Sequence, residues 1–202
     1  QARFDAGEIF LAGDVAQRMS VSSMPVREAL ARLVSERALE AMPNRRVRVP
    51  LLPLERARDI AQARTRIESE LAARAIANLT PADIERLEML TTEYEDTSDP
   101  QDVATLNHAF HFHLYEAAGS SVFMPIVESL WMQAGPYVRA AAKLHKPLTD
   151  TAATLHHRGI LEAIRSGDKA RVARELTADI SQAFAILERA DPDFWNDGEG
   201  GA

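Results

Sequence analysis

Four residues in the second half of the chain have side chains that could together bind a metal ion. Asn107 and His111 are four residues apart, so they share one face if their segment is helical. His157 and Asp179 follow in later segments. If a bundle of helices brought them together, an oxygen ligand, two imidazoles and a carboxylate could hold a divalent ion such as zinc, nickel or manganese. The alternative is that these polar side chains line a wet groove or form buried hydrogen bonds.

Basic residues near the N-terminus could bind a different partner, the phosphates and bases of DNA. Arg27 and Arg32 lie in a short segment with helical spacing, and Arg45 and Arg46 lie in a turn that follows it. A guanidinium group can donate two hydrogen bonds to a guanine or pair with a phosphate. Each arginine alone is most simply a solvated surface charge. Their arrangement on a helix and a turn favours DNA binding.

The segment 1–50 must fold into elements that present these arginines, and it predicts two short helices. The first helix should begin at Gly13, with Asp14 as its N-cap. A tight turn at Ser20 and Val21 should follow. Two short helices joined by a tight turn form a helix-turn-helix, a common DNA-binding unit.

The second helix should begin at Ser22 or Ser23, because either side chain can cap it. Pro25 then lies in the first turn, where a missing N–H costs nothing. Arg27 should point away from the apolar face of this helix. That face contains Val26, Ala29, Leu30 and Leu33.

A short hairpin after the second helix should carry Arg45 and Arg46 at its tip. Residues 38–42 and the alternating residues 47–49 indicate two strands, and Pro43-Asn44 is typical of a turn. Such a basic hairpin, or wing, can contact the DNA backbone or minor groove while a helix lies in the major groove.

From residue 55 to 190 the sequence predicts an antiparallel bundle of about six helices. Pro136 should kink the fourth of them. A short connector, 51–54, should join the bundle to the N-terminal module 1–50, and the acidic, glycine-rich tail 191–202 should fray. The fold class is therefore mostly α, with a winged helix-turn-helix and a small β wing before the bundle. The expected helices span residues 55–78, 80–96, 99–118, 121–144, 147–166 and 168–190.

Composition and charge exclude several classes of protein. No apolar run approaches the roughly 18 to 20 residues of a membrane-spanning helix. There is no cysteine, which excludes disulfides and thiolate metal sites and fits a cytoplasmic protein without a visible signal peptide. The net charge is -7, but residues 23–50 hold six arginines and three glutamates, a balance of +3. A basic end on an acidic body suits a module that binds phosphates.

The N-terminal module resembles the winged helix of the GntR family of bacterial transcription regulators. The resemblance lies in Val21-Ser22-x-x-Pro25-Val26-Arg27-Glu28-Ala29-Leu30-x-x-Leu33 and in Pro43-Asn44-Arg45. It implies that Arg27 reads a guanine and that Arg45 and Arg46 belong to the wing. The expected DNA contacts are Ser22, Ser23, Met24, Arg27, Arg32, Arg45 and Arg46.

Two positions depart from that family's pattern. The family often has arginine where this chain has Ser23, and glycine where it has Arg46. Both departures bear on the operator sequence that is read, with more of the affinity falling to the wing and to phosphates. The family also has a helix before the turn at Phe4, which we expect to lie upstream of Gln1.

Residues 55–190 resemble the all-helical domain called FCD, found in the FadR subgroup of this family. The resemblance lies in Arg64-x-x-Ile67-Glu68, in Asn107-x-x-Phe110-His111, and in the run from His157 to Asp168. It implies a metal site formed by one aspartate and three histidines, at the positions of Asn107, His111, His157 and Asp179. Asparagine here replaces the aspartate, and aspartate replaces the last histidine.

These exchanges imply weaker metal binding or a different metal preference, because an asparagine oxygen is a weak neutral ligand. His156 is an alternative ligand, since it lies only about 100° around the helix from its neighbour. The resemblance also implies that Arg64, with the metal, clamps a carboxylate; the alternative is an ion pair with a glutamate of its own helix. The expected effector-binding residues are Arg64, His111, Tyr137, Arg139, His156 and His157.

The sequence therefore predicts a ligand-responsive, dimeric DNA-binding transcription regulator, acting as a repressor or an activator. Its effector should be a small organic acid rather than a long acyl thioester, because the groove keeps polar residues. The first alternative is a metal-dependent hydrolase-type enzyme, although no glutamate or serine is placed as a clear general base. The second is a helical dimerisation scaffold without a ligand.

Overall fold

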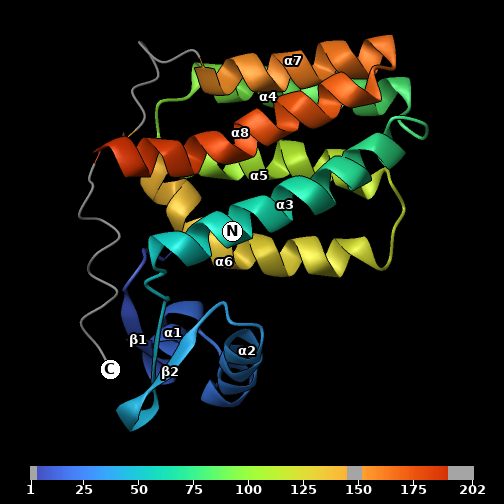
Figure 1. Ribbon diagram of the computed structural model, residues 1–202. Coiled ribbons are helices and arrows are strands. Elements are labelled where there is room, and N and C mark those ends of the chain that lie inside the picture. The colour runs from blue at the N-terminus through green and yellow to red at the C-terminus, as the bar shows by residue number, and fades with distance from the viewer. Residues whose placement is uncertain (1–3, 145–151, 191–202) are drawn as a thin grey trace.

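The computed structural model describes residues 4–144 and 152–190, which form a small N-terminal part and a larger helical body (Figure 1). Among these residues, two α-helices, one short 3-10 helix (η1, Pro43–Arg45) and three strands form the N-terminal part, and six α-helices form the body. The mostly α fold that the sequence predicts is confirmed. The body consists of α3 (Leu54–Ala75), α4 (Pro81–Asp96), α5 (Pro100–Glu116), α6 (Phe123–Leu144), α7 (Ala152–Ser166) and α8 (Lys169–Ala190).

The N-terminal part packs two helices, α1 (Ala12–Met19) and α2 (Ser23–Ser35), against a small antiparallel sheet. The sheet order is β1-β3-β2, so the hairpin of β2 and β3 gains a third strand from the short extended piece before α1. Val47 on β3 pairs with Phe10 on one side and Ala41 on the other. The strands are β1 (Ile9–Leu11), β2 (Glu40–Met42) and β3 (Arg46–Arg48).

The helix starts in this part differ in detail from the sequence-based expectation. Helix α1 begins at Ala12, with Leu11 at the N-cap position, so Asp14 lies in the first turn and does not cap the helix. An acidic side chain in the first turn still interacts favourably with the helix dipole. Ser22 occupies the N-cap position of α2, but its side chain makes no capping hydrogen bond. The expected tight turn is present, with Ser20 in the left-handed conformation (φ 55°).

The wing tip contains backbone conformations that are unusual for its residues. Asn44 and Arg45 both have positive φ, 60° and 59°, in the turn between β2 and β3. Asparagine tolerates this region better than most residues, whereas arginine has no such preference. Arg46 itself is extended, at φ -87°. The left-handed positions of the wing tip are therefore Asn44 and Arg45, and not Arg46, where the resembling family often has glycine.

The six helices of the body stack in layers above the N-terminal part. Figure 1 shows α7 and α4 along the top, α8 and α5 in the middle, and α3 and α6 below them. The larger of two apolar clusters in the body spans these layers. Its fully buried members include Leu71, Phe110, Leu114, Ile160 and Leu176, contributed by α3, α5, α7 and α8.

Most helix boundaries follow the expected caps. The Thr80 side chain accepts a hydrogen bond from the Asp83 amide, and the Asp83 carboxylate accepts one from the Thr80 amide, so α4 begins with a complete capping box. Helix α3 ends at Ala75, three residues before the expected end at 78. The expected start of the fifth body helix at 147 and the tail 191–202 lie outside the described residues.

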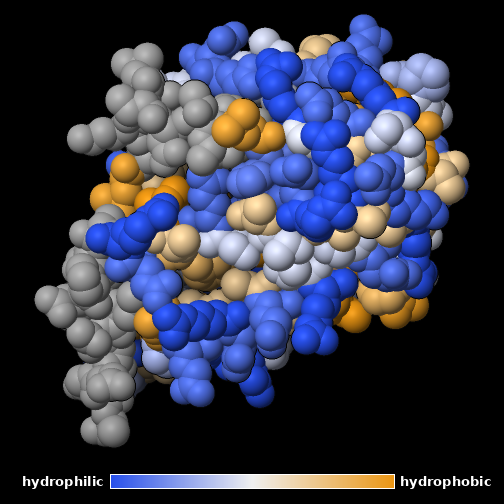
Figure 2. Space-filling model, turned by 45° about the horizontal axis from the view of Figure 1, so that its top comes forward, coloured by the Kyte–Doolittle hydropathy of each residue, from blue (hydrophilic) through white to orange (hydrophobic). Residues whose placement is uncertain are grey.

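One face of the molecule is mostly polar (Figure 2). Figure 2 shows one face on which hydrophilic residues predominate and apolar residues gather only in small separate groups. Within the part of the chain that the structure describes, none of the helices is both long and apolar enough to cross a membrane.

Helix α6 connects the body to the segment that leads from the wing. Pro136 lies inside it, and in Figure 1 its amber C-terminal part turns away from its yellow N-terminal part. The next residue, Tyr137, is buried. Its hydroxyl donates to the Pro50 carbonyl at 2.8 Å and accepts from the Leu52 amide at 2.5 Å. The connector is therefore bonded to α6 rather than free.

Two ion pairs add a second contact between the N-terminal part and the helical body. Lys143 lies 2.8 Å from the Asp5 carboxylate, and Arg139 lies 3.3 Å from it. Because these groups are partly exposed, each pair contributes little to stability alone. Together with the buried Tyr137 hydroxyl, they attach the N-terminal part to one short stretch of α6.

Replacing Tyr137 by phenylalanine should loosen the connector. The buried Leu52 amide would lose the hydroxyl to which it donates among the described residues, which costs about 1–3 kcal/mol. We expect hydrogen–deuterium exchange of residues 51–54 to accelerate by roughly ten-fold or more, while exchange in α7 stays unchanged. Equal exchange in the two proteins at residues 51–54 would show that this hydroxyl does not hold the connector.

Candidate functional site

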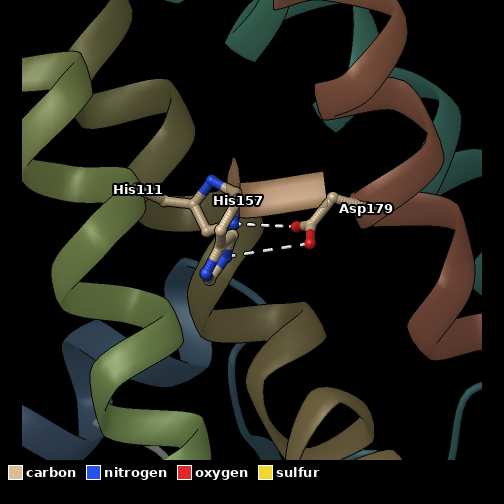
Figure 3. Close-up of side chains that lie close together, drawn as sticks. All are labelled: His111, His157 and Asp179. Carbon is tan, nitrogen blue, oxygen red and sulfur yellow. Dashed lines mark hydrogen bonds and ion pairs between the residues drawn. The ribbon is translucent and has the colours of Figure 1, made fainter. Parts of the chain in front are cut away.

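Three of the four predicted metal-binding residues meet in the centre of the helical body. His111 of α5, His157 of α7 and Asp179 of α8 place one ligand atom each within 4.8 Å of one another (Figure 3). The His111 Nε2 atom lies 2.8 Å from Asp179 Oδ2, and His157 Nε2 lies 3.8 Å from Asp179 Oδ1. Both histidines are fully buried. The structure thus brings together side chains that are 68 residues apart in the chain.

Asn107 completes the predicted set. It lies one turn before His111 on α5, and its Oδ1 is 3.2 Å from His157 Nε2. The amide oxygen therefore contacts His157 Nε2, the same nitrogen that faces Asp179. All four positions meet at one point, as the packing of three helices was expected to arrange them.

The helix packing fixes the imidazole of His157 in place. The ring of Phe110 stacks on His157, with 4.1 Å between ring centroids and an interplanar angle of 16°. Tyr94 of α4 lies against the same imidazole, with 4.9 Å between ring centroids. Phe110 is itself part of the apolar core, so His157 is held by the same side chains that hold α5 and α7 together.

Burial and mutual interaction shift the pKa values of these groups. Burial lowers the pKa of His157 to about 4, so its imidazole is neutral near pH 7. Burial alone would raise the pKa of Asp179, but interaction and hydrogen bonding with His111 outweigh it and hold this pKa below its ordinary value. Neutral imidazoles and an ionised carboxylate are the forms that bind metal ions.

Several electron-pair donors face one another at this point. Nδ1 of His157 is not one of them, because it is the ring nitrogen on the other side, buried and without a hydrogen-bond partner among the described residues. His157 Nε2 faces two oxygens, Asn107 Oδ1 and Asp179 Oδ1. Two imidazoles, a carboxylate and an amide oxygen form a donor set that suits a divalent transition metal. The residues present therefore fit such an ion.

A small cavity of about 50 Å³ opens beside Asn107 and Asp179. Most of its wall is aliphatic and comes from α5, α6 and α8. A volume of this kind holds on the order of four water molecules, since one needs about 10–15 Å³. The lining residues are Tyr94, Val103, Ala104, Asn107, Val138, Ala141, Ala142, Asp179, Gln182, Ala183 and Ile186.

Arg64 does not line this cavity but forms an ion pair with Glu68 of its own helix. Its Nε lies 2.7 Å from Glu68 Oε1, and both side chains are almost completely buried. The guanidinium also lies 4.1 Å from the centre of the Trp131 ring. The alternative considered for Arg64, an ion pair within α3, is therefore the arrangement that the structure shows.

The other expected effector-binding residues also have partners elsewhere. Tyr137 bonds the connector, and Arg139 donates to Gln101 at 2.8 Å in addition to its contact with Asp5. His156 lies 3.1 Å from Glu175, on the outer side of α7 and α8. Only the two histidines of the metal-binding group, among the six residues expected to bind effector, lie at this point.

Sequence reasoning missed a second layer of residues behind His111. The Tyr115 hydroxyl lies 3.1 Å from His111 Nδ1 and donates to Glu68 Oε2 at 2.6 Å. Trp131 Nε1 donates to the same oxygen at 3.0 Å. The four-residue spacing between His111 and Tyr115 is the signal that could have identified this tyrosine.

The residues expected to contact DNA form an exposed surface on the N-terminal part. On α2, Val26 and Leu30 are buried in the local core, so the opposite face of the helix is free. Met24 is 64% exposed, although it is apolar, and Arg32 is engaged with Glu36 at 2.7 Å. The exposed set consists of Ser22, Ser23, Met24, Arg27, Arg32, Arg45 and Arg46.

Comparison with known proteins finds two family models that match separate parts of the chain. Residues 1–49 match the family described as bacterial regulatory proteins of the gntR family, and residues 59–182 match the FCD domain. The HTH-type transcriptional regulator McbR of Escherichia coli (strain K12) is 27% identical over 184 residues, covering 90% of this chain and 83% of that protein.

Solved structures and a further relative extend the comparison. The structure of E. coli McbR/YncC has a TM-score of 0.86 at 26% identity and covers 92% of this chain and 89% of its own. A putative L-lactate dehydrogenase operon regulatory protein of E. coli (strain K12) is 25% identical over 200 residues, covering 89% of this chain and 77% of that protein. A putative GntR regulator from Rhodococcus sp. RHA1, at 21% identity and a TM-score of 0.73 over 93% of this chain and 90% of its own, shares the fold.

The lowered pKa of His157 predicts a pH-dependent stability. Between the ordinary value of 6.5 and the folded value of about 4, the unfolded chain binds more protons at this residue than the folded chain does. The free energy of unfolding should therefore fall as pH falls through this window. His108, whose pKa burial also lowers to about 4, should act in the same direction.

Denaturant unfolding of metal-free protein across this pH range would measure the effect. His157→Gln should have a shallower dependence on pH than the wild type, because one of the two contributing groups is removed. An identical pH dependence in both proteins would contradict the assignment.

Proposed function

This chain belongs to the FCD-domain group of bacterial regulatory proteins of the gntR family, and we propose that it is a dimeric repressor controlled by a small carboxylate bound beside a metal ion. It is a ligand-responsive DNA-binding transcription regulator, and its family and relatives are regulators rather than enzymes. We place its action in the cytoplasm, where a bacterial operator lies.

The observation that carries the metal proposal is the meeting of His111, His157, Asp179 and Asn107 at one end of a cavity. The two imidazoles and the carboxylate would be the principal ligands, and the asparagine oxygen a weaker fourth. When bound, a divalent ion such as zinc, nickel or manganese would supply a Lewis-acid site for one oxygen of a carboxylate.

The charges around the cavity support an effector that depends on this ion. Asp179 is the one charged residue among the described residues that line the cavity. Arg64 is paired with Glu68, and Lys143 with Asp5. A carboxylate placed next to Asp179 without a cation would be repelled and unpaired. The effector carboxylate therefore binds to the metal alone and is not clamped between the metal and Arg64. Arg64 supports the site indirectly, through its ion pair with Glu68.

The aliphatic wall and small volume of the cavity favour a short organic acid. A long acyl thioester does not fit a cavity of about 50 Å³. An acid with more than a few non-hydrogen atoms would push against the walls. The wall that includes Val138, Ala141 and Ala142 belongs to the second half of α6.

The same half of α6 offers a route from the cavity to the DNA-binding part. Val138, Ala141 and Ala142 line the cavity, while Tyr137 holds the connector and Lys143 pairs with Asp5. The residues that line the cavity and the residues that contact the N-terminal part thus lie within the same two turns of one helix. A ligand that binds better to a displaced α6 would thereby favour a different placement of the winged helix.

In the DNA complex, Arg27 would donate to a guanine edge in the major groove, with Ser22, Ser23 and Met24 beside it. Arg45 and Arg46 at the wing tip would bind phosphates or the minor groove. Two copies would read a near-palindromic operator with half-sites about one helical turn apart.

Arg27→Ala should weaken specific operator binding by about 1–3 kcal/mol, because it removes the contact to a base edge. The affinity can be measured on a duplex selected from random sequences by the wild-type protein. Arg86→Ala, an exposed arginine on α4, is the matched control and should bind as the wild type does. Unchanged operator affinity in Arg27→Ala would remove this residue from the recognition surface.

His111→Ala should lose most of the bound metal, because it removes a ligand that three helices hold in place. Elemental analysis after equilibration with zinc and gel filtration would measure the metal content. His113→Ala, which removes a histidine that pairs with Asp83 instead, is the control. Equal metal content in wild type, His111→Ala and His113→Ala would exclude His111 as a ligand.

Asn107→Asp should bind zinc more tightly than the wild type, because a carboxylate replaces a neutral oxygen.

A further inference from the structure

A continuous set of buried hydrogen bonds leads from His111 away from the metal-binding group to helix α3. The Tyr115 hydroxyl lies between His111 Nδ1, at 3.1 Å, and Glu68 Oε2, at 2.6 Å. All three side chains are fully buried. Neither the DNA-binding surface nor the four candidate ligands account for this arrangement.

Glu68 is held in place by fixed donors. Arg64 donates to it through Nε at 2.7 Å and through its terminal nitrogen at 3.3 Å, and Trp131 Nε1 donates at 3.0 Å. The guanidinium lies over the Trp131 ring, 4.1 Å from its centre. A planar guanidinium that binds a carboxylate through two nitrogens fixes its orientation as well as its charge. Glu68 is therefore a rigid acceptor for the Tyr115 hydroxyl.

The number of available protons determines how these groups are bonded. Tyrosine has one hydroxyl proton, and it is donated to Glu68. The tyrosine oxygen can then only accept from His111, which must carry a proton on Nδ1. In the neutral imidazole the other nitrogen, Nε2, has a free lone pair.

This lone pair is directed at the candidate metal position. His111 Nε2 lies 2.8 Å from Asp179 Oδ2, a distance at which a proton on Nε2 would form a hydrogen bond and ion pair. With the single proton of the neutral ring on Nδ1, both atoms instead offer lone pairs, and a cation is the partner that satisfies both. His157 differs, because its Nδ1 has no partner among the described residues. Of the two imidazoles, His111 is therefore the one whose orientation and tautomer are held from behind.

We propose that Tyr115 is a positioning residue that holds His111 in the Nδ1–H tautomer, with Glu68, Arg64 and Trp131 fixing Tyr115 in turn. The presented Nε2 atom is then ready to bind a cation. Only the identity of that cation rests on the proposed function, because the tautomer is a property of the metal-free chain. The arrangement also gives Arg64 a role at the site that requires no contact with effector.

The first test is the tautomer of His111 in the full-length, metal-free protein in mildly alkaline buffer. Long-range proton–nitrogen NMR correlations assign the proton to Nδ1 or Nε2. We expect Nδ1–H in the wild type and a shift toward Nε2–H in Tyr115→Phe, where Nδ1 has no acceptor and Asp179 remains one. A proton on Nε2 in the wild type, or the same tautomer in both proteins, overturns the proposal.

The second test is zinc affinity, measured by calorimetric competition with a chelator. Loss of the partner behind a histidine ligand typically weakens metal binding about 10- to 100-fold, and we expect this loss in Tyr115→Phe. Thr91→Val is the matched control, because it removes a buried hydroxyl whose hydrogen bond stays within α4, to the Leu87 carbonyl. Equal zinc affinity in wild type and Tyr115→Phe overturns the positioning role.

The two readouts also separate this proposal from the proposed function. If the wild type has the Nδ1–H tautomer but binds neither zinc nor nickel nor manganese, the proposed metal is wrong and the tautomer assignment stands. If it binds zinc tightly with a proton on the wrong nitrogen beforehand, the metal stands and the role of Tyr115 is wrong.

Discussion

The ion pair between Arg64 and Glu68 lies at the centre of the helical body, where both side chains are almost completely buried. A buried charge is costly unless it is paired and its remaining hydrogen-bonding atoms are satisfied. Here the carboxylate accepts from Tyr115 and Trp131 as well as from Arg64, so α3, α5 and α6 are joined at one oxygen pair. Loss of one partner would leave the others buried and unpaired. This requirement orders the polar interior on which the candidate site depends.

From this ion pair the polar interior extends to the candidate metal-binding group. His111 has Tyr115 on one side and Asp179 on the other, so it links the rigid carboxylate of α3 to the carboxylate of α8. The cavity begins where this polar row ends, and beyond it the wall is aliphatic. A ligand at this point would be recognised by charge at one end and by shape at the other, as small-molecule sites in proteins commonly are.

Helix α6 contacts both the candidate ligand site and the connector to the N-terminal part. Trp131 in its first half donates to Glu68, and its second half lines the cavity and holds the connector through Tyr137. The proline between these halves removes one backbone hydrogen bond and lets the second half take its own direction. A regulator must convert ligand binding into a change at DNA, and this helix is the physical element that contacts both regions.

Much of the fold could be predicted from the sequence because local rules determine it. The spacing of apolar residues and caps such as Thr80 with Asp83 placed six body helices, and the motif around Arg27 placed the helix-turn-helix. The third strand, β1, was expected only as an extended piece, because strand pairing is a long-range contact. The N-cap of α1 was misplaced at Asp14, since a side chain able to cap a helix does not have to occupy the cap position.

For the candidate site, the sequence by itself determined which side chains share a face of one helix, as with Asn107 and His111. It could not determine what faces them from another helix. The partner of Arg64, the hydroxyl of Tyr115 behind His111, and the direction of Tyr137 toward the connector depend on how helices pack. Periodicity sets the direction of a side chain around its own helix axis, whereas distances between helices follow from the packing of the whole core. The tertiary structure alone therefore decided that Arg64 pairs with Glu68 outside the cavity and that the cavity wall is mostly aliphatic.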